Sequence, residues 1–164
     1  MRYRPGDVYR CIRLKNDSDD LDFPQFEYID RVPTVIDIAG FTRITENSIN
    51  QVIELSGIDV ANWCAMKKYD ANKRSYMQLY VDLSESASHS ALASSQLLSD
   101  HLSIYFKYYD NDYEDLKKML GIDPLSVTIL PCGTMTKFEK IFGRPLRKIN
   151  ASRQDEIELL RLRL

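Results

Sequence analysis

The sequence predicts an α+β fold in which helices cover one face of a single four-stranded antiparallel sheet. The first observation is order. Between residues 34 and 130 the patterns run strand, helix, strand, strand, helix, strand, with one extra short helix before the last strand. The second is the strict alternation of residues 75–83, which is typical of a strand. The third is length, because 164 residues suffice for one domain with a hydrophobic core. This order is that of the split β-α-β, or ferredoxin-like, arrangement.

An N-terminal β-hairpin is predicted before this region. Residues 7–14 form its first strand, and residues 26–29 form a short return strand. Residues 15–22 between them are acidic and contain serine. They lack the glycine that a calcium-binding EF-hand loop requires, so we interpret them as a solvated loop.

Residues 34–47 combine a strand, a turn and the start of a helix. The strand over residues 34–38 is rich in β-branched residues, which suit a half-buried sheet. The chain then breaks at Ala39 and Gly40, where glycine allows an unusual backbone turn. Thr45 is expected to cap the helix that follows.

Arg43 is therefore predicted to lie in a loop between the end of a strand and the start of a helix. Such a loop presents a cation and backbone N–H groups to an anion. The alternative is an ordinary connection in which the arginine is solvated, or pairs with a neighbouring carboxylate such as Asp37 or Glu46.

The remaining elements follow from hydrophobic periodicity. In the strand over residues 75–83, one set of side chains is expected to face the core: Met77, Leu79, Val81 and Leu83. The opposite face carries Tyr76, Gln78, Tyr80 and Asp82. The other expected elements are a helix over residues 45–56, a strand over 60–69, a long helix over 86–108, a short helix capped by Asn111 or Asp112 that ends at Gly121, a strand over 124–130, a helix from Gly133 to residue 142, and a final helix capped by Ser152. We expect three segments, with boundaries at 1–32, 33–149 and 150–164.

Composition argues against several classes of partner. The net charge is −2 and the isoelectric point is near 5.7, which argues against nucleic-acid binding through a basic surface. Cys11, Cys64 and Cys132 are widely spaced, so neither a disulfide framework nor a zinc site is expected. No apolar run approaches ~20 residues and no signal peptide opens the chain, so we expect a cytoplasmic protein without a membrane partner.

Motifs of self-contained catalysis are absent from the sequence. It has no nucleophile elbow, zinc-protease motif, P-loop or dinucleotide fingerprint. Ser99, Asp100 and His101 are adjacent on a predicted helix, so they point in different directions and form no triad. His89 and His101 lack partners at ligand spacing, so no metal site is expected. From these residues alone, the sequence indicates an α+β domain without an active site of its own.

Three ordered segments carry a resemblance to a known family. Residues 3–7, Y-R-P-G-D, resemble an element of adenylate-forming enzymes. Residues 38–46, I-A-G-F-T-R-I-T-E, resemble the glycine-lysine-threonine-glutamate loop that follows it. Residues 125–138 resemble the strand, Gly-Thr and helix near the end of the auxin-responsive acyl acid amido synthetases. Over nearly its whole length, the chain is similar to the C-terminal domain of that family.

The resemblance implies a role in joining a small-molecule carboxylic acid to an amino acid through an acyl-adenylate. ATP with Mg²⁺ is the implied cofactor of the full-length parent, and none is expected to bind this fragment. The implied partner is the N-terminal adenylation domain, over which the C-terminal domain is a mobile lid. Asp7 matches the aspartate that binds the ribose hydroxyls. Arg43 matches a phosphate-approaching lysine, beside Gly40 and Thr42 in the implied nucleotide site.

The sequence departs from the family pattern at two places. Position 43 is arginine, which keeps the charge of lysine but changes its shape. The tail motif tyrosine-lysine-x-proline-arginine is absent, and Asn150 stands where its lysine is expected. Lys148 and Arg153 are the candidate tail cations. The fragment alone is expected to be inactive. The alternatives are an autonomous ferredoxin-like ligand-binding or regulatory module, and an interaction domain with a tyrosine-rich face.

Overall fold

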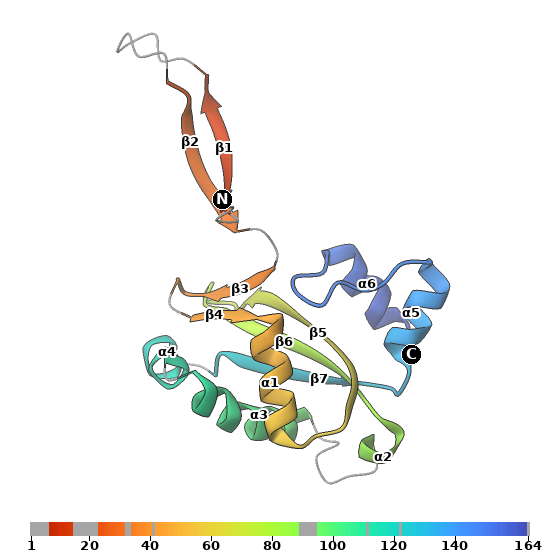
Figure 1. Cartoon of the computed structure of the whole chain (residues 1–164). Coiled ribbons are helices and arrows are strands. Elements are labelled where there is room, and N and C mark those ends of the chain that lie inside the picture. Colours follow the sequence, from red (N-terminus) through yellow and green to blue (C-terminus); the bar gives the residue numbers. More distant parts are fainter. Residues whose placement is uncertain are drawn as a thin grey trace, which may run out of the picture. The chain divides into compact units, whose positions relative to one another are not determined.

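The computed structural model describes residues 7–14, 23–31, 34–40, 42–88, 95–110, 112–121 and 123–163. The chain divides into two compact units, Met1–Thr34 and Val35–Leu164. Figure 1 shows the elements of both. The fold is mixed α+β, as the sequence predicts. None of the described helices is long and apolar enough to cross a membrane.

The first unit contains the predicted hairpin, built from β1 (Asp7–Arg13) and β2 (Gln25–Arg31) in antiparallel register. On one face the rings of Tyr9 and Phe26 make an edge contact, with centroids 6.5 Å apart. Arg10 and Glu27 are register partners and form an ion pair at 3.8 Å. The predicted acidic loop over residues 15–22 lies outside the described residues.

The strand arrangement of the second unit differs from the prediction. β3 (Val35–Ile38) pairs with β4 (Thr42–Thr45) in a small antiparallel hairpin of its own. β5 (Val60–Tyr69), β6 (Ser75–Leu83) and β7 (Leu125–Leu130) form a separate three-stranded sheet in the order β5-β6-β7. β5 and β6 are antiparallel, but β6 and β7 are parallel. The single four-stranded antiparallel sheet was therefore a wrong expectation.

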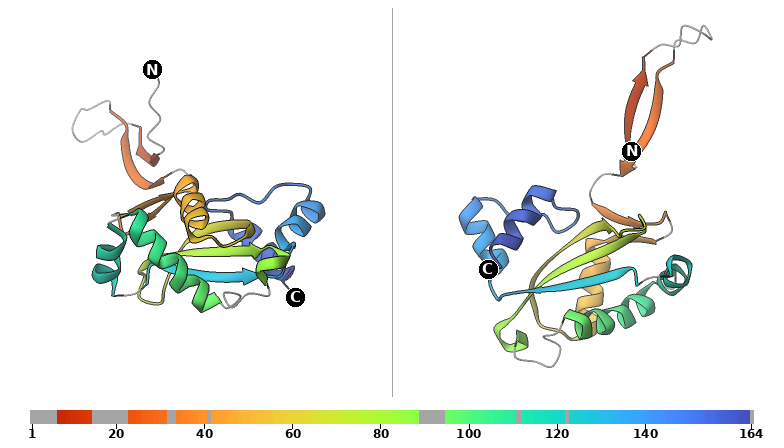
Figure 2. Two further views of the ribbon diagram at one scale, coloured as in Figure 1. Left: turned by 60° about the horizontal axis from the view of Figure 1, so that its bottom comes forward. Right: turned by 180° about the vertical axis from the view of Figure 1, so that it is seen from behind.

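Helices cover both faces of the three-stranded sheet, so the expectation of helices on one face was also wrong (Figure 2). α1 (Glu46–Ser56), α3 (Ser95–Tyr109) and α4 (Asp112–Leu120) pack over the first face. α5 (Thr134–Phe142) and α6 (Arg153–Arg161) pack over the second. The expected long helix over residues 86–108 corresponds to α2 (Glu85–Ser88) and α3, with residues 89–94 outside the described part.

Two hydrophobic clusters lie on the two sides of β6. The predicted core set is completely or almost completely buried on the first side: Met77, Leu79, Val81 and Leu83. On the second side Tyr80 packs with Met135, Phe138 and Leu159 from the C-terminal helices. Because those helices cover the second side, Gln78 and Asp82 are buried as well.

The ends of the helices have local causes in the sequence. The hydroxyl of Thr45 accepts from the Ser48 N–H at 3.1 Å and caps α1, as predicted. α1 ends at Gly57 with a φ of 68°, a conformation that favours glycine. Gly133 begins α5 without a side chain to cap it. The carboxylate of Asp82 on β6 accepts from the Gly133 and Met135 N–H groups at 2.8 and 3.2 Å and supplies that cap.

Candidate functional site

The turn between β3 and β4 is fixed by hydrogen bonds to its backbone. Ala39 and Gly40 have φ values of 56° and 72°. The Gly40 N–H donates to Asp37 Oδ1 at 2.8 Å, and the Ala39 N–H donates to Ser75 Oγ at 3.0 Å. The left-handed backbone of Ala39 is unfavourable for a residue with a Cβ, so these bonds must hold the turn.

Arg43 lies on strand β4, directly opposite Asp37 on β3. The expectation that residues 42–43 form a loop was wrong. The reason is an alternation in residues 42–45 that extends the hairpin: Thr42 and Ile44 point inward and Arg43 points outward.

The Arg43 side chain is exposed, and no ion pair or hydrogen bond joins it to another described residue. The pairing with Asp37 or Glu46 that the sequence left open is therefore not formed. One Asp37 oxygen is instead used by the Gly40 N–H. The Arg43 cation is available to an anion from outside the unit.

The other predicted nucleotide-binding residues have different surroundings. Thr42 is 2% exposed, so its hydroxyl does not reach the surface, and no described residue forms a hydrogen bond with that hydroxyl. Gly40 is exposed in the turn beside Arg43. Asp7 is the first residue of β1 and belongs to the first unit. The structure thus brings Gly40, Thr42 and Arg43 together on one hairpin.

The tail segment 148–150 pairs with the outer edge of β5. The Ala65 N–H donates to the Lys148 carbonyl, and the Asn150 N–H donates to the Ala65 carbonyl, both at 2.8 Å. These bonds make a parallel bridge between Ala65 and Ile149. The tail therefore extends the three-stranded sheet by one short segment.

Asn150 has a left-handed backbone, with a φ of 49°. Its side-chain oxygen accepts from the Lys67 N–H at 3.0 Å. Its side-chain nitrogen donates to the Val35 carbonyl at 3.1 Å. One residue thus connects the tail, the central sheet and the β3–β4 hairpin, a role that the sequence pattern did not indicate.

The ammonium of Lys148 is held beside the β5 edge. Its Nζ lies 5.0 Å from the centroid of the Trp63 ring and donates to Asn62 Oδ1. The Trp63 ring is itself fixed, because its Nε1–H donates to Asn50 Oδ1 on α1 at 3.0 Å. Burial lowers the pKa of Lys148, and the carboxylate of Glu46 partly opposes this shift.

Arg153, the second candidate tail cation, is the first residue of α6 and is exposed. The positive end of a helix dipole disfavours a cation at this position. Helix stabilisation therefore does not explain its charge. Of the two, Lys148 alone makes side-chain contacts with described residues.

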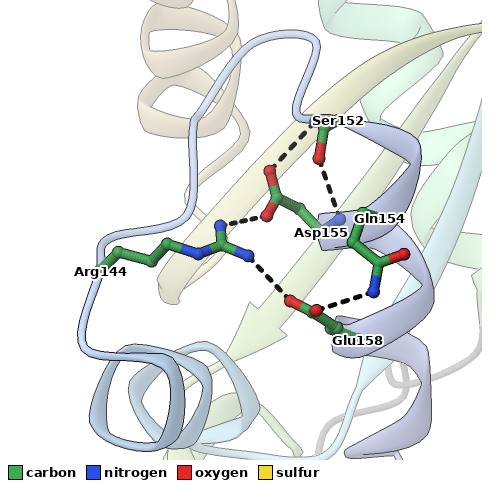
Figure 3. A network of polar contacts seen from close by, with 5 residues as sticks. All are labelled: Arg144, Ser152, Gln154, Asp155 and Glu158. Carbon is green, nitrogen blue, oxygen red and sulfur yellow. Dashed lines mark hydrogen bonds and ion pairs between the residues drawn. The ribbon is translucent and has the colours of Figure 1, made fainter.

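The side chain of Arg144 connects α6 with α5 (Figure 3). Its guanidinium reaches from the chain between the two helices and binds Asp155 and, at 2.8 Å, Glu158. It also stacks over the Phe138 ring, 5.2 Å from the centroid. Ser152 caps α6 as predicted, in a capping box with Asp155. The arginine was not predicted, because its partners lie 11 and 14 positions further along the chain.

A second buried contact joins α6 to the sheet. Glu156 is 7% exposed, accepts a hydrogen bond from the Tyr80 hydroxyl and pairs with Lys68. Burial, reinforced by this neighbouring carboxylate, raises the pKa of Tyr80. The tail that carries Lys148 is thereby attached to the sheet at both ends.

Comparisons with known proteins give a structural likeness only. No family model matches the chain, and no curated protein matches it. Among solved structures, the acyl acid amido synthetase GH3.15 matches 98% of this chain and 31% of its own, with a TM-score of 0.53 and 15% identity. A 2-hydroxyisobutyryl-CoA ligase in its postadenylation state also matches, over 96% of this chain and 30% of its own, with a TM-score of 0.47 and 14% identity.

At this identity the likeness shows a shared fold. The chain spans about one third of the length of these solved structures. Within the described residues no group of three or more His, Cys, Asp or Glu side chains is arranged to hold a metal ion. The predicted cations of the second unit are Arg43 on β4, Lys148 beside the edge of β5 and Arg153 at the start of α6.

Proposed function

We propose that the chain is the C-terminal lid of an acyl-adenylating ligase, which joins a carboxylic acid to the amine of an amino acid. The main observation behind this proposal is that 98% of this chain matches the structure of an acyl acid amido synthetase but covers only 31% of that longer chain. A lid needs the larger remaining part to complete its site. The lack of a self-contained catalytic motif agrees with that need.

The cations of the second unit give the lid its chemistry. Arg43 is exposed and free of described ion pairs, so closure of the lid would bring its charge to the phosphates of ATP. ATP with Mg²⁺, held mainly by the parent, supplies the activation of the carboxylate. Water is excluded on closure, and the attraction between guanidinium and phosphate then strengthens. Lys148 is the second cation in this scheme, and Asp7 is the carboxylate for the ribose hydroxyls.

The hairpin of the first unit supports an N-terminal adenylation domain as the partner. Tyr9, Ile12 and Phe26 are each more than half exposed. A two-stranded hairpin is marginally stable in water on its own. An apolar surface of this kind is stabilised when another domain covers it, and the part that precedes the lid in a ligase is the occupant we propose. A cytoplasmic location follows from the same role, because ATP is the co-substrate.

A second candidate function is an autonomous module that binds a small anion. The observation in its favour is that Val35–Leu164 forms a compact unit with two hydrophobic clusters of its own. In that case Arg43 and the β3–β4 turn would hold the anion without another domain.

The mass of the native polypeptide separates the two candidates. An antibody raised against this chain is used to detect the protein in its source cells. The lid proposal predicts a single band far above the 19.1 kDa of this chain, with the larger domain upstream. A band at 19.1 kDa alone would favour the autonomous module and contradict the lid.

A further inference from the structure

The backbone of Asn150 is in the left-handed region, with a φ of 49°. Few residues with a Cβ adopt this region, although asparagine does so more readily than most. Such conformations persist where neighbouring groups over-determine them. At Asn150 those groups are the Ala65 carbonyl, the Lys67 N–H and the Val35 carbonyl, each within 3.1 Å of an Asn150 nitrogen or oxygen.

These three bonds fix the chain next to Lys148. The Lys148 carbonyl accepts from the Ala65 N–H, and the Ile149 side chain is 3% exposed in the first hydrophobic cluster. The segment can therefore neither rotate nor move away from β5 without breaking the contacts of Lys148, Ile149 and Asn150. A long lysine side chain otherwise samples many rotamers.

We infer that Asn150 is the positioning residue of Lys148, holding its ammonium between the Trp63 ring and the side-chain oxygen of Asn62, where the proposed tail cation acts. This inference rests on the proposed function, in which Lys148 meets the nucleotide. Asn150 itself touches no reacting atom in this scheme. Its side-chain oxygen and nitrogen each bond to a backbone group of the protein.

The electrostatic surroundings of Lys148 make its position measurable. Burial lowers its pKa, while Glu46 on α1, Cys64 on β5 and Glu139 on α5 act in the opposite direction. A Lys148 side chain released into water would lose the burial effect and titrate near the ordinary 10.5. The pKa of Lys148 thus reports whether the ammonium is still held.

The test is an NMR titration of the Lys148 side chain in the 164-residue chain and in three variants. Asn150→Gly keeps the left-handed backbone available but removes both side-chain bonds. Asn150→Asp keeps an oxygen for the Lys67 N–H and removes the donor to Val35. Asn72→Gly, in an exposed turn, is the matched control.

We expect the pKa of Lys148 to rise toward 10.5 in Asn150→Gly and to stay lowered in Asn72→Gly. The Lys148 methylene signals, shifted by the Trp63 ring current, should move toward random-coil values in Asn150→Gly and Asn150→Asp. The ring-current shift does not depend on the charge of the new aspartate. If Asn150→Gly fails to fold, this shift in Asn150→Asp therefore shows whether Lys148 is still held.

A lowered melting temperature with unchanged Lys148 pKa and ring-current shifts would overturn the inference, because Asn150 would then be structural only. A different result would contradict the proposed role of Lys148 in catalysis. In that result, Lys148→Ala leaves the turnover of the longer native polypeptide unchanged, while the pKa and ring-current shifts of Lys148 in the isolated chain still change when Asn150 is replaced.

Discussion

The side-chain nitrogen of Asn150 donates to the Val35 carbonyl across 3.1 Å, although the two residues lie 115 positions apart. This bond joins the last part of the chain to the first strand of the second unit. The same side chain accepts from Lys67 on β5, so the β3–β4 hairpin and the three-stranded sheet share one polar link. The hairpin that carries Arg43 and the segment that carries Lys148 are thereby held in one unit.

The core prediction concerns Leu79, which is completely buried on the first side of β6. Leu79→Ala removes buried apolar area and leaves a cavity, so it should lower the free energy of unfolding by roughly 2–5 kcal/mol. Urea denaturation of the chain measures this. Leu97→Ala is the control, because Leu97 is 51% exposed and its truncation should cost less than about 0.5 kcal/mol. Equal losses in the two variants would show that the assigned core is wrong.

A pH prediction concerns Asp155 on α6. Burial alone would raise its pKa, but hydrogen bonds from Ser152 and Arg144 outweigh burial, and the pKa lies below the ordinary 3.8. The pKa is lower in the folded than in the unfolded protein. The stabilisation is therefore present above the unfolded value and lost as the pH falls through the folded one.

Asp155→Asn should therefore destabilise the chain most near neutral pH, and the difference from the wild type should shrink as the pH falls below about 4. Thermal melts from pH 7 to pH 2.5 measure this difference. A difference that stays constant over the whole range would mean that the charge of Asp155 contributes nothing to the attachment of α6.

The prediction for Arg43 concerns turnover in the longer native polypeptide. Arg43→Ala should slow amide formation by ~10²-fold, which corresponds to about 2.7 kcal/mol of transition-state stabilisation. Arg43→Lys should be milder, because lysine keeps the cation. Lys137→Ala, an exposed cation on α5, is the control. Melting temperatures of the isolated variants should not change, since Arg43 makes no described ion pair. Unchanged turnover in Arg43→Ala would end its catalytic assignment.

Local patterns in the sequence predicted the local elements. The alternation of residues 75–83 identified β6 and its buried face, and Thr45 and Ser152 marked the starts of α1 and α6. Each of these signals acts within a few residues. The parallel pairing of β6 with β7 depends instead on how the chain returns through α3 and α4, and short-range periodicity carries no such information.

The burial of the second face of the sheet was not predicted, for a related reason. Alternation placed the polar residues Gln78 and Asp82 on the face opposite the core set, and helices were expected on one face only, but α5 and α6 cover that side. Gly133 was the available signal, because a helix that starts without its own capping side chain needs an acceptor from elsewhere. Asp82 is that acceptor. Arg43 was identified as a candidate from sequence, while Asn150 was noted only as a departure from a motif.

The lid proposal is tested most directly by carboxylate-dependent ATP–pyrophosphate exchange, measured with the native polypeptide captured by an antibody against this chain. We predict exchange that requires both ATP and a carboxylic acid in the longer polypeptide, and none above background in the purified 164-residue chain. Exchange by the isolated chain, or no exchange by the longer polypeptide with any acid of a broad panel, would contradict the lid proposal.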